Sequence, residues 1–352
     1  GMIILAALAA TGCDDRSKPK AGGTTAQPTA TAKAAAKGLE AADNDDKVVE
    51  LAKKALGCEW KDKTGIKYDC ADLKAWKDSE LVKAGKADKT LVNMLADDNE
   101  RVRWLGAQAL SSRGKIYRSD KKLATRVLVA AKAEKKAVVA SHLGSALGRI
   151  NTDKTGLEAE IKKVIETHEL QQLRRSTVSA VLFNNRNFYP FHMKLAKEEK
   201  NKDVRKAAVS AFWTGTPKGK YGETCKLWLD RTINDEDHNI AGEAAYLCGF
   251  YSAGGGCKEQ WDPMLDAVAA KAKDGKVKSS QMAAALYYFH KQKDASAAQK
   301  ARALAIARQI AENKNNSGAA RARALEFIAE QDPAGRMFVA KFEKDDDFFV
   351  KS

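Results

Sequence analysis

One phrase recurs along this sequence, most clearly as Val102-Arg103-Trp104-Leu105-Gly106-Ala107-Gln108-Ala109-Leu110. It carries an arginine early, small residues at helical spacing, and at its end a large apolar residue that is termed the anchor below. With Leu110 as the first anchor, the equivalent residues are Leu147, Val181, Phe212, Cys248, Leu286 and Ile328. Successive anchors are 37, 34, 31, 36, 38 and 42 residues apart. A period of this length indicates an array of similar structural units.

The residues around and between the anchors are patterned as helices. Five of the seven units carry alanine directly before the anchor, where a small side chain lets a neighbouring helix approach closely: Ala109, Ala146, Ala180, Ala211 and Ala285. A second amphipathic segment lies between successive anchors, as in the apolar residues at positions 157, 161, 164 and 165, and its spacing is helical. The pair Asp262-Pro263 is typical of a helix start. We therefore expect an all-α fold with two helices per unit.

The phrase resembles the HEAT repeat in three copies, which span residues 98–110, 203–212 and 237–248. The resemblance extends over residues from about 88 to 345. It implies an α-solenoid, in which each helix pair contacts only its neighbours, with about seven pairs in residues 88–352. Residues 46–87, with an apolar segment and a loop bounded by cysteines, are then expected to form an N-terminal helical cap. Such repeats indicate architecture better than function.

Residues 1–13 are an apolar run that ends in small residues and a cysteine. The box Ala10-Thr11-Gly12-Cys13 is similar to that of bacterial lipoprotein signals. The resemblance implies a lipid on Cys13 and a place on the periplasmic side of the bacterial cell envelope, anchored in the inner or the outer membrane. The alternative is an N-terminal helix with an incidental cysteine. The run is too short to span a bilayer, which needs roughly 20 residues.

Residues 14–45 contain Leu39 as their only large apolar side chain. Such a segment cannot bury enough surface to offset its ordering entropy, so we expect a flexible, low-complexity tether. Acidic and basic residues balance within residues 1–45, and the net charge of +15 therefore belongs to the remainder of the chain. This surplus favours an anionic partner.

The cysteines fit an exported protein. Cys58 and Cys70 flank a loop in the expected cap, and we predict a disulfide between them. Among Cys225, Cys248 and Cys257, we favour a Cys248–Cys257 bond across a glycine-rich loop, with Cys225–Cys257 as the close alternative. Cys248, at an anchor position, could instead be a small core residue. The sequence lacks Cys-x-x-Cys and His-x-x-x-His spacings, and its histidines are scattered, so we expect no metal or cofactor.

Arginine recurs seven residues before the anchor, at Arg103, Arg174, Arg205 and Arg321. In HEAT repeats an arginine here commonly forms a structural ladder with a turn aspartate, which implies the pairs Asp98–Arg103 and Asp203–Arg205. The other interpretation is a cationic binding stripe, to which Arg175 would also belong. Its partner would be a protein or an anionic component of the envelope.

Two classes of function follow. The first is a non-catalytic, membrane-tethered scaffold that binds its partner through the repeat surface. The alternative is an enzyme on a HEAT-like scaffold, such as a DNA glycosylase for alkylated bases or a phycobilin lyase, and Trp104, Trp213 and Trp228 would suit the glycosylase as stacking platforms. The export signal argues against a nucleic-acid substrate. The sequence has no Gly-x-Ser-x-Gly elbow, so no catalytic residue is predicted.

Overall fold

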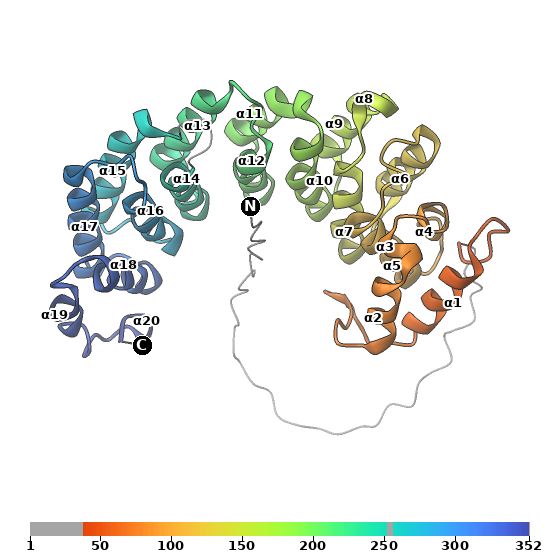
Figure 1. The fold of residues 1–352 in the computed structure, drawn as a ribbon, viewed down its shortest axis with the longest axis horizontal. Helices are drawn as coiled ribbons and strands as arrows, with labels where there is room; N and C mark the ends of the chain where they lie inside the picture. Colours follow the sequence, from red (N-terminus) through yellow and green to blue (C-terminus); the bar gives the residue numbers. More distant parts are fainter. Residues whose placement is uncertain (1–37, 252–255, 352) are drawn as a thin grey trace. The chain divides into compact units, whose positions relative to one another are not determined.

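In the computed structural model, residues 38–251 and 256–351 are described (Figure 1). Their regular structure is almost entirely α-helical, which confirms the predicted all-α class. The exceptions within these residues are a 3-10 turn, η1 (Arg186–Phe188), and a small hairpin of β1 (Trp60–Lys61) and β2 (Gly65–Ile66). The predicted signal in residues 1–13, with Cys13, and most of the predicted tether lie outside the described residues.

The anchor-bearing helices form one series, termed row A. It consists of α5 (Glu100–Ser112), α7 (Ala137–Gly148), α10 (Gln171–Asn184), α12 (Lys202–Gly215), α14 (His238–Phe250), α16 (Ser280–His290) and α18 (Gly318–Gln331). The helix that directly precedes each of these in the chain belongs to row B. Row B consists of α4 (Asp88–Met94), α6 (Lys121–Ala133), α9 (Glu158–Thr167), α11 (Tyr189–Glu198), α13 (Tyr221–Asn234), α15 (Lys258–Lys273) and α17 (Ala297–Glu312). The remaining helices are α1 (Asp46–Ala55), α2 (Ala71–Asp78), α3 (Glu80–Lys83), α8 (Thr152–Thr155), α19 (Gly335–Ala340) and α20 (Phe348–Lys351).

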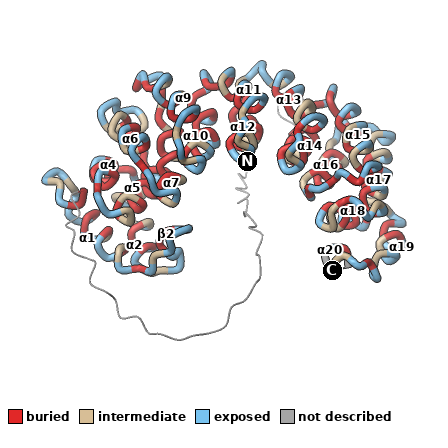
Figure 2. The backbone as a smooth tube through the Cα atoms, turned by 180° about the vertical axis from the view of Figure 1, so that it is seen from behind, coloured by how far each residue is buried: buried red, intermediate tan, exposed pale blue. Residues whose placement is uncertain are grey.

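The pairs follow one another in chain order. Each row A helix from α5 to α18 contacts the next one in its row. Row B is joined in the same way from α4 through α6 to α9, and from α11 through α13 and α15 to α17. All seven anchors have fully buried side chains, which confirms the register of the repeat. Figure 2 shows buried residues recurring on every pair.

The closest packing within row A lies between α7 and α10, and glycine makes it possible. A Cβ atom on Gly144 would lie 2.5 Å from the backbone oxygen of Leu173, which is closer than real atoms approach. Removing the side chain lets the two backbones come together. Five of the seven row A helices begin with a capping side chain, and the exceptions are α7 and α10. Asn99, for example, accepts a hydrogen bond from the Arg101 backbone N–H at 2.9 Å.

The N-terminal segment contacts the first pair through its hairpin, where β2 lies against α5. Cys58 and Cys70 are joined by a disulfide, the pairing expected from the sequence. Gly65 has a φ of 84° and lies against the Trp104 ring, where a Cβ atom would come within 2.3 Å of the indole. Residues 38–45 do not behave as part of the tether, because the Gly38 N–H donates to the Asp97 carboxylate at 2.8 Å and the Asp45 N–H to the Thr90 hydroxyl at 2.9 Å.

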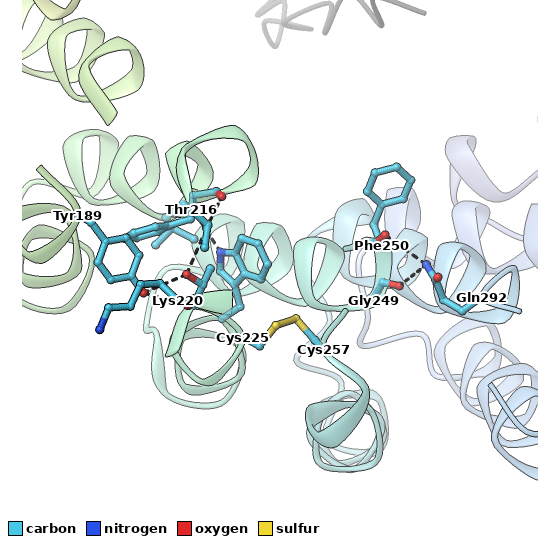
Figure 3. Close-up of a disulfide and its surroundings, with 12 residues drawn as sticks. Tyr189, Thr216, Lys220, Cys225, Gly249, Phe250, Cys257 and Gln292 are labelled. Atoms are coloured by element: carbon cyan, nitrogen blue, oxygen red, sulfur yellow. Dashed lines mark hydrogen bonds between the residues drawn. A yellow bond between two sulfur atoms is a disulfide. The ribbon is translucent and has the colours of Figure 1, made fainter. Parts of the chain in front are cut away.

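The predicted Cys248–Cys257 bond is wrong. The structure pairs Cys225 of α13 with Cys257, the residue before α15, and so joins two row B helices (Figure 3). Cys248 is a free thiol on row A, and burial raises its pKa to about 12. An anchor position points into the packed helix interface, so Cys248 acts there as a small core side chain, the alternative that the sequence analysis kept.

The predicted helix start at Asp262-Pro263 is wrong. This pair lies inside α15, which begins at Lys258. Within the described residues, no helix combines the length and the hydropathy that a membrane span requires.

Candidate binding surface

The recurring arginines of row A lie in ion pairs. Three of them pair with an acidic side chain that follows the next row B helix along the chain, and Arg321 pairs with Asp345, which follows α19. These four pairs, termed the arginine ladder, are Arg103–Glu134, Arg174–Glu199, Arg205–Asp235 and Arg321–Asp345. Three of the acids directly follow a row B helix, namely α6, α11 and α13. The side chains are largely covered in every pair, so their charges are screened little by solvent.

Each ladder arginine also bonds to the backbone before its own helix. Arg205 donates from Nε and Nη2 to the two carboxylate oxygens of Asp235, at 3.1 and 3.0 Å, and from Nη1 to the Glu199 carbonyl oxygen at 2.7 Å. Asp235 in turn accepts the Asp237 N–H at 3.0 Å, at the start of α14. Arg205 therefore contacts the C-terminal ends of α11 and α13, and its acid also contacts the start of α14, so that the ladder joins neighbouring pairs.

At the last pair of the ladder, the arginine changes the titration of its acid. The Arg321 guanidinium lowers the pKa of the Asp345 carboxyl to about 2, and the Asp347 N–H adds to this effect. The partners differ from those implied by the HEAT resemblance, since the carboxylates are not those of Asp98 and Asp203. Arg103 contacts the backbone oxygen of Asp98, at 3.0 Å, and its ion pair is with Glu134.

The cationic stripe predicted from the sequence is thus neutralised at four of its five residues. Arg103, Arg174, Arg205 and Arg321 carry out the structural role that was the other interpretation. Arg175, the fifth, is exposed on α10. A binding surface therefore has to be sought beside the ladder.

Partly exposed aromatic rings gather on α12, α14 and α16. We term Trp213, Tyr246, Phe250, Tyr287 and Tyr288 the aromatic platform. The Phe250 ring lies at its centre, with centroid distances of 5.4 Å to Trp213, 5.7 Å to Tyr246 and 5.1 Å to Tyr288. Tyr287 extends the group, at 5.1 Å from Tyr288. None of the five is fully buried, although all pack against the core or one another.

Polar groups hold and border the platform. The Gln292 side-chain amide donates to the carbonyl oxygens of Gly249 and Phe250, at 3.0 and 3.2 Å, and fixes the end of α14 (Figure 3). Burial, with Tyr288 and Glu243 nearby, raises the pKa of Tyr246 to about 12, so its hydroxyl stays protonated and can donate. The Arg323 guanidinium lies over the Tyr287 ring at 5.2 Å.

The other tryptophans named in the sequence analysis cannot serve a ligand. Trp104 and Trp228 are fully buried, and the Trp228 indole donates to the Val209 carbonyl oxygen at 3.1 Å. Neither ring is accessible for stacking on a base, and of the three tryptophans only Trp213 is partly exposed.

The described titratable clusters suit structure better than metal binding. One group of three potential ligands is found among these residues, at Cys58, Cys70 and Asp72, but its two sulfur atoms are bonded to each other. Burial lowers the pKa of both His142 and His192 to about 4. His192 is enclosed in the core with its ring nitrogens near the Val178 and Phe188 carbonyl oxygens.

No protein-family model, curated protein or solved structure matches this chain. Of the platform residues, only Trp213 was predicted from the sequence as a possible contact residue, because aromatic residues within a helical repeat are usually assigned to the core. The sequence feature that could have identified them is their position relative to the buried anchor. Trp213 and Tyr287 come one residue after an anchor, while Phe250 and Tyr288 come two residues after. The anchor itself is buried, so these positions turn toward the edge of the interface.

Proposed function

We propose that this protein is a non-catalytic scaffold of the bacterial cell envelope, a HEAT-like α-solenoid tethered to a membrane through a lipid on Cys13. It holds an acidic protein partner on the row A surface. The aromatic platform is the observation that carries this proposal. Five partly exposed aromatic rings from three successive helices form a preformed contact area.

Aromatic side chains supply much of the energy of protein interfaces. Tyrosine and tryptophan are enriched among the residues that dominate binding, because they bury a large area with few rotatable bonds. The platform has the expected polar edge, with Glu243 bonded to Ser210 at 3.0 Å and Lys291 paired with Glu330 at 3.2 Å. The helix pairs and the ladder hold it rigid, so little entropy is lost on binding.

The charge of the chain favours an acidic partner. The surplus of +15 lies within residues 46–352, while the ladder uses only part of the basic side chains. A positive field speeds the encounter with an acidic protein, and this effect weakens as salt screens it.

Capture from native membranes tests the proposal. Full-length protein is used as bait, captured proteins are identified, and binding of the purified candidate is then measured. We expect the double variant Trp213→Ala/Tyr288→Ala to bind at least tenfold more weakly with an unchanged helical spectrum. Ile233→Ala on row B is the matched control, since Ile233 is also an exposed large apolar residue. Equal binding by wild type and the double variant would overturn the proposal.

A further inference from the structure

A second feature of the row A side is a pocket of about 390 Å³ between α7 and α10. Two arginines lie in its wall: Arg118, from the connection between α5 and α6, and Arg149, the residue that ends α7. The other lining side chains are mostly hydroxyl or amide groups: Ser145, Ser176, Ser179, Asn184 and Thr214. Phe183 also lines the pocket, and 59% of its surface is exposed.

These two arginines differ from those of the ladder. In the described part of the chain, no carboxylate lies within ion-pair distance of Arg118 or Arg149. Both are half-buried, and the Arg118 Nε is buried with no hydrogen-bond partner. The Arg118 guanidinium interacts with the hydroxyl of Tyr117, a neutral group.

Among the described acids, Asp88 is weakly influenced by the charge of Arg118. Its Oδ2 accepts the backbone N–H groups of Lys115 and Tyr117, both at 2.9 Å, whereas its buried Oδ1 has no hydrogen-bond partner and forms no ion pair with Arg118. Burial, together with the charge of Arg118, lowers the pKa of Arg149. Two like charges therefore face a pocket that no carboxylate lines, an arrangement that an entering anion would stabilise.

We propose that this pocket binds the phosphoryl group of a phosphate monoester. Two guanidinium groups offer forked N–H donors that match phosphate oxygens. Asn184 uses one amide hydrogen for the Ala180 carbonyl oxygen, at 3.1 Å, and keeps the other. The Ser176 hydroxyl has only a long contact, 3.4 Å, to Ser141 and can rotate toward a ligand.

The size and lining of the pocket favour a small phosphorylated molecule over a bare ion. A volume of about 390 Å³ is within the range of small-ligand sites and leaves room beside the phosphoryl group. The exposed Phe183 ring gives the organic part an apolar contact. The number of donors exceeds what a single carboxylate can accept. This site is separate from the aromatic platform, and the inference does not depend on the proposed function.

Calorimetric titration of the full-length protein tests the inference. The probes are inorganic phosphate, glucose 6-phosphate and, to distinguish a lipid source, vesicles with and without phosphatidic acid. Sodium chloride at equal ionic strength and sodium acetate are the reference anions. We expect glucose 6-phosphate to bind more tightly than phosphate, and acetate at least tenfold more weakly than either. If vesicles with phosphatidic acid bind and glucose 6-phosphate does not, the monoester is a lipid headgroup.

Substitutions test whether Arg149 binds the ligand or only supports the fold. Arg149→Gln should weaken phosphate binding at least tenfold and should leave the melting temperature of the ligand-free protein unchanged or higher, because it removes a like-charge contact. Arg149→Lys should lose part of the affinity while it keeps the charge. Arg336→Gln, an exposed arginine of α19, is the control and should bind as wild type does. The inference is overturned if phosphate binds wild type no better than chloride does, or if Arg149→Gln binds it equally well.

Discussion

Charge reversal at two adjacent arginines of α10 compares an arginine that stabilises the fold with one that is exposed to solvent. Arg174 pairs with Glu199, with only 13% and 11% of the two side chains exposed, and its Nε donates to the Ile165 carbonyl oxygen. Arg175, the next residue, is exposed. Arg174→Glu would place two carboxylates together in a covered site and leave a carbonyl oxygen without its donor. Arg175→Glu would only change the charge of a solvated position.

The losses of stability expected for Arg174→Glu and Arg175→Glu differ enough to be measured. Removing one partner of a buried ion pair costs about 3–5 kcal/mol, whereas an exposed substitution usually stays within about 0.5 kcal/mol. With an unfolding entropy of about 2.1 cal/mol/K per residue over roughly 300 folded residues, 1 kcal/mol lowers the melting temperature by about 1.6 °C. Arg174→Glu should therefore lower it by about 5–8 °C, and Arg175→Glu by less than about 1 °C.

Thermal unfolding followed by circular dichroism gives the comparison, and a second substitution isolates the pair. Glu199→Gln in the Arg174→Glu background removes the repulsion and should recover part of the loss. If Arg174→Glu melts within 1 °C of Arg175→Glu, the ladder does not stabilise the fold and the assignment of Arg174 to it is wrong.

Further predictions concern the cysteines, the N-terminus and pH. Cys225→Ser/Cys257→Ser should lose about 3–4 kcal/mol of stability, the loop entropy for a separation of 32 residues, as measured by urea unfolding. Cys248 should react with iodoacetamide only after unfolding, because its thiol is buried; rapid labelling of native protein, read by peptide mass, would contradict its place in the core. Intact-mass analysis of membrane-extracted protein should show acylation that Cys13→Ser abolishes, and an unmodified wild type would refute the lipid anchor. His192 has a folded pKa of about 4 against an ordinary 6.5, so the unfolded chain binds the proton first and stability falls below about pH 6.5. By pH 5 the loss from His192 should be about 2 kcal/mol, and His192→Gln should flatten this part of the pH profile of unfolding.

The repeat register could be predicted from the sequence because burial follows periodicity directly. A large apolar residue that returns every 31 to 42 positions on a helix has to face the same interface each time, and all seven anchors do. The Cys58–Cys70 bond followed from proximity in the chain. The Cys225–Cys257 bond did not, because it depends on how α13 lies against α15, a contact between elements that sequence spacing does not report.

The arginines of the ladder could be predicted from the sequence, but their acidic partners could not. The arginine positions follow the anchors, but their acidic partners lie 24 to 31 residues later and are found only once the pairs are stacked. One feature of the sequence pointed to where the acids lie. Where Ala140 replaces the arginine in α7, His168 takes the acid's place and accepts the Leu170 N–H at 3.0 Å. The Arg118/Arg149 pocket gave no such signal, since its residues belong to four separate segments of the chain.

Site-specific photo-crosslinking in intact cells tests most directly whether row A holds the partner. A photoreactive phenylalanine analogue is placed at Tyr288 in the platform, or at Ile233 on row B as the reference, in otherwise wild-type full-length protein. We predict one dominant adduct with an acidic envelope protein from position 288, which weakens when Trp213→Ala is added, and little or none from position 233. Adducts of equal yield and identity from both positions, or an adduct at 288 that Trp213→Ala leaves unchanged, would contradict a binding surface on row A.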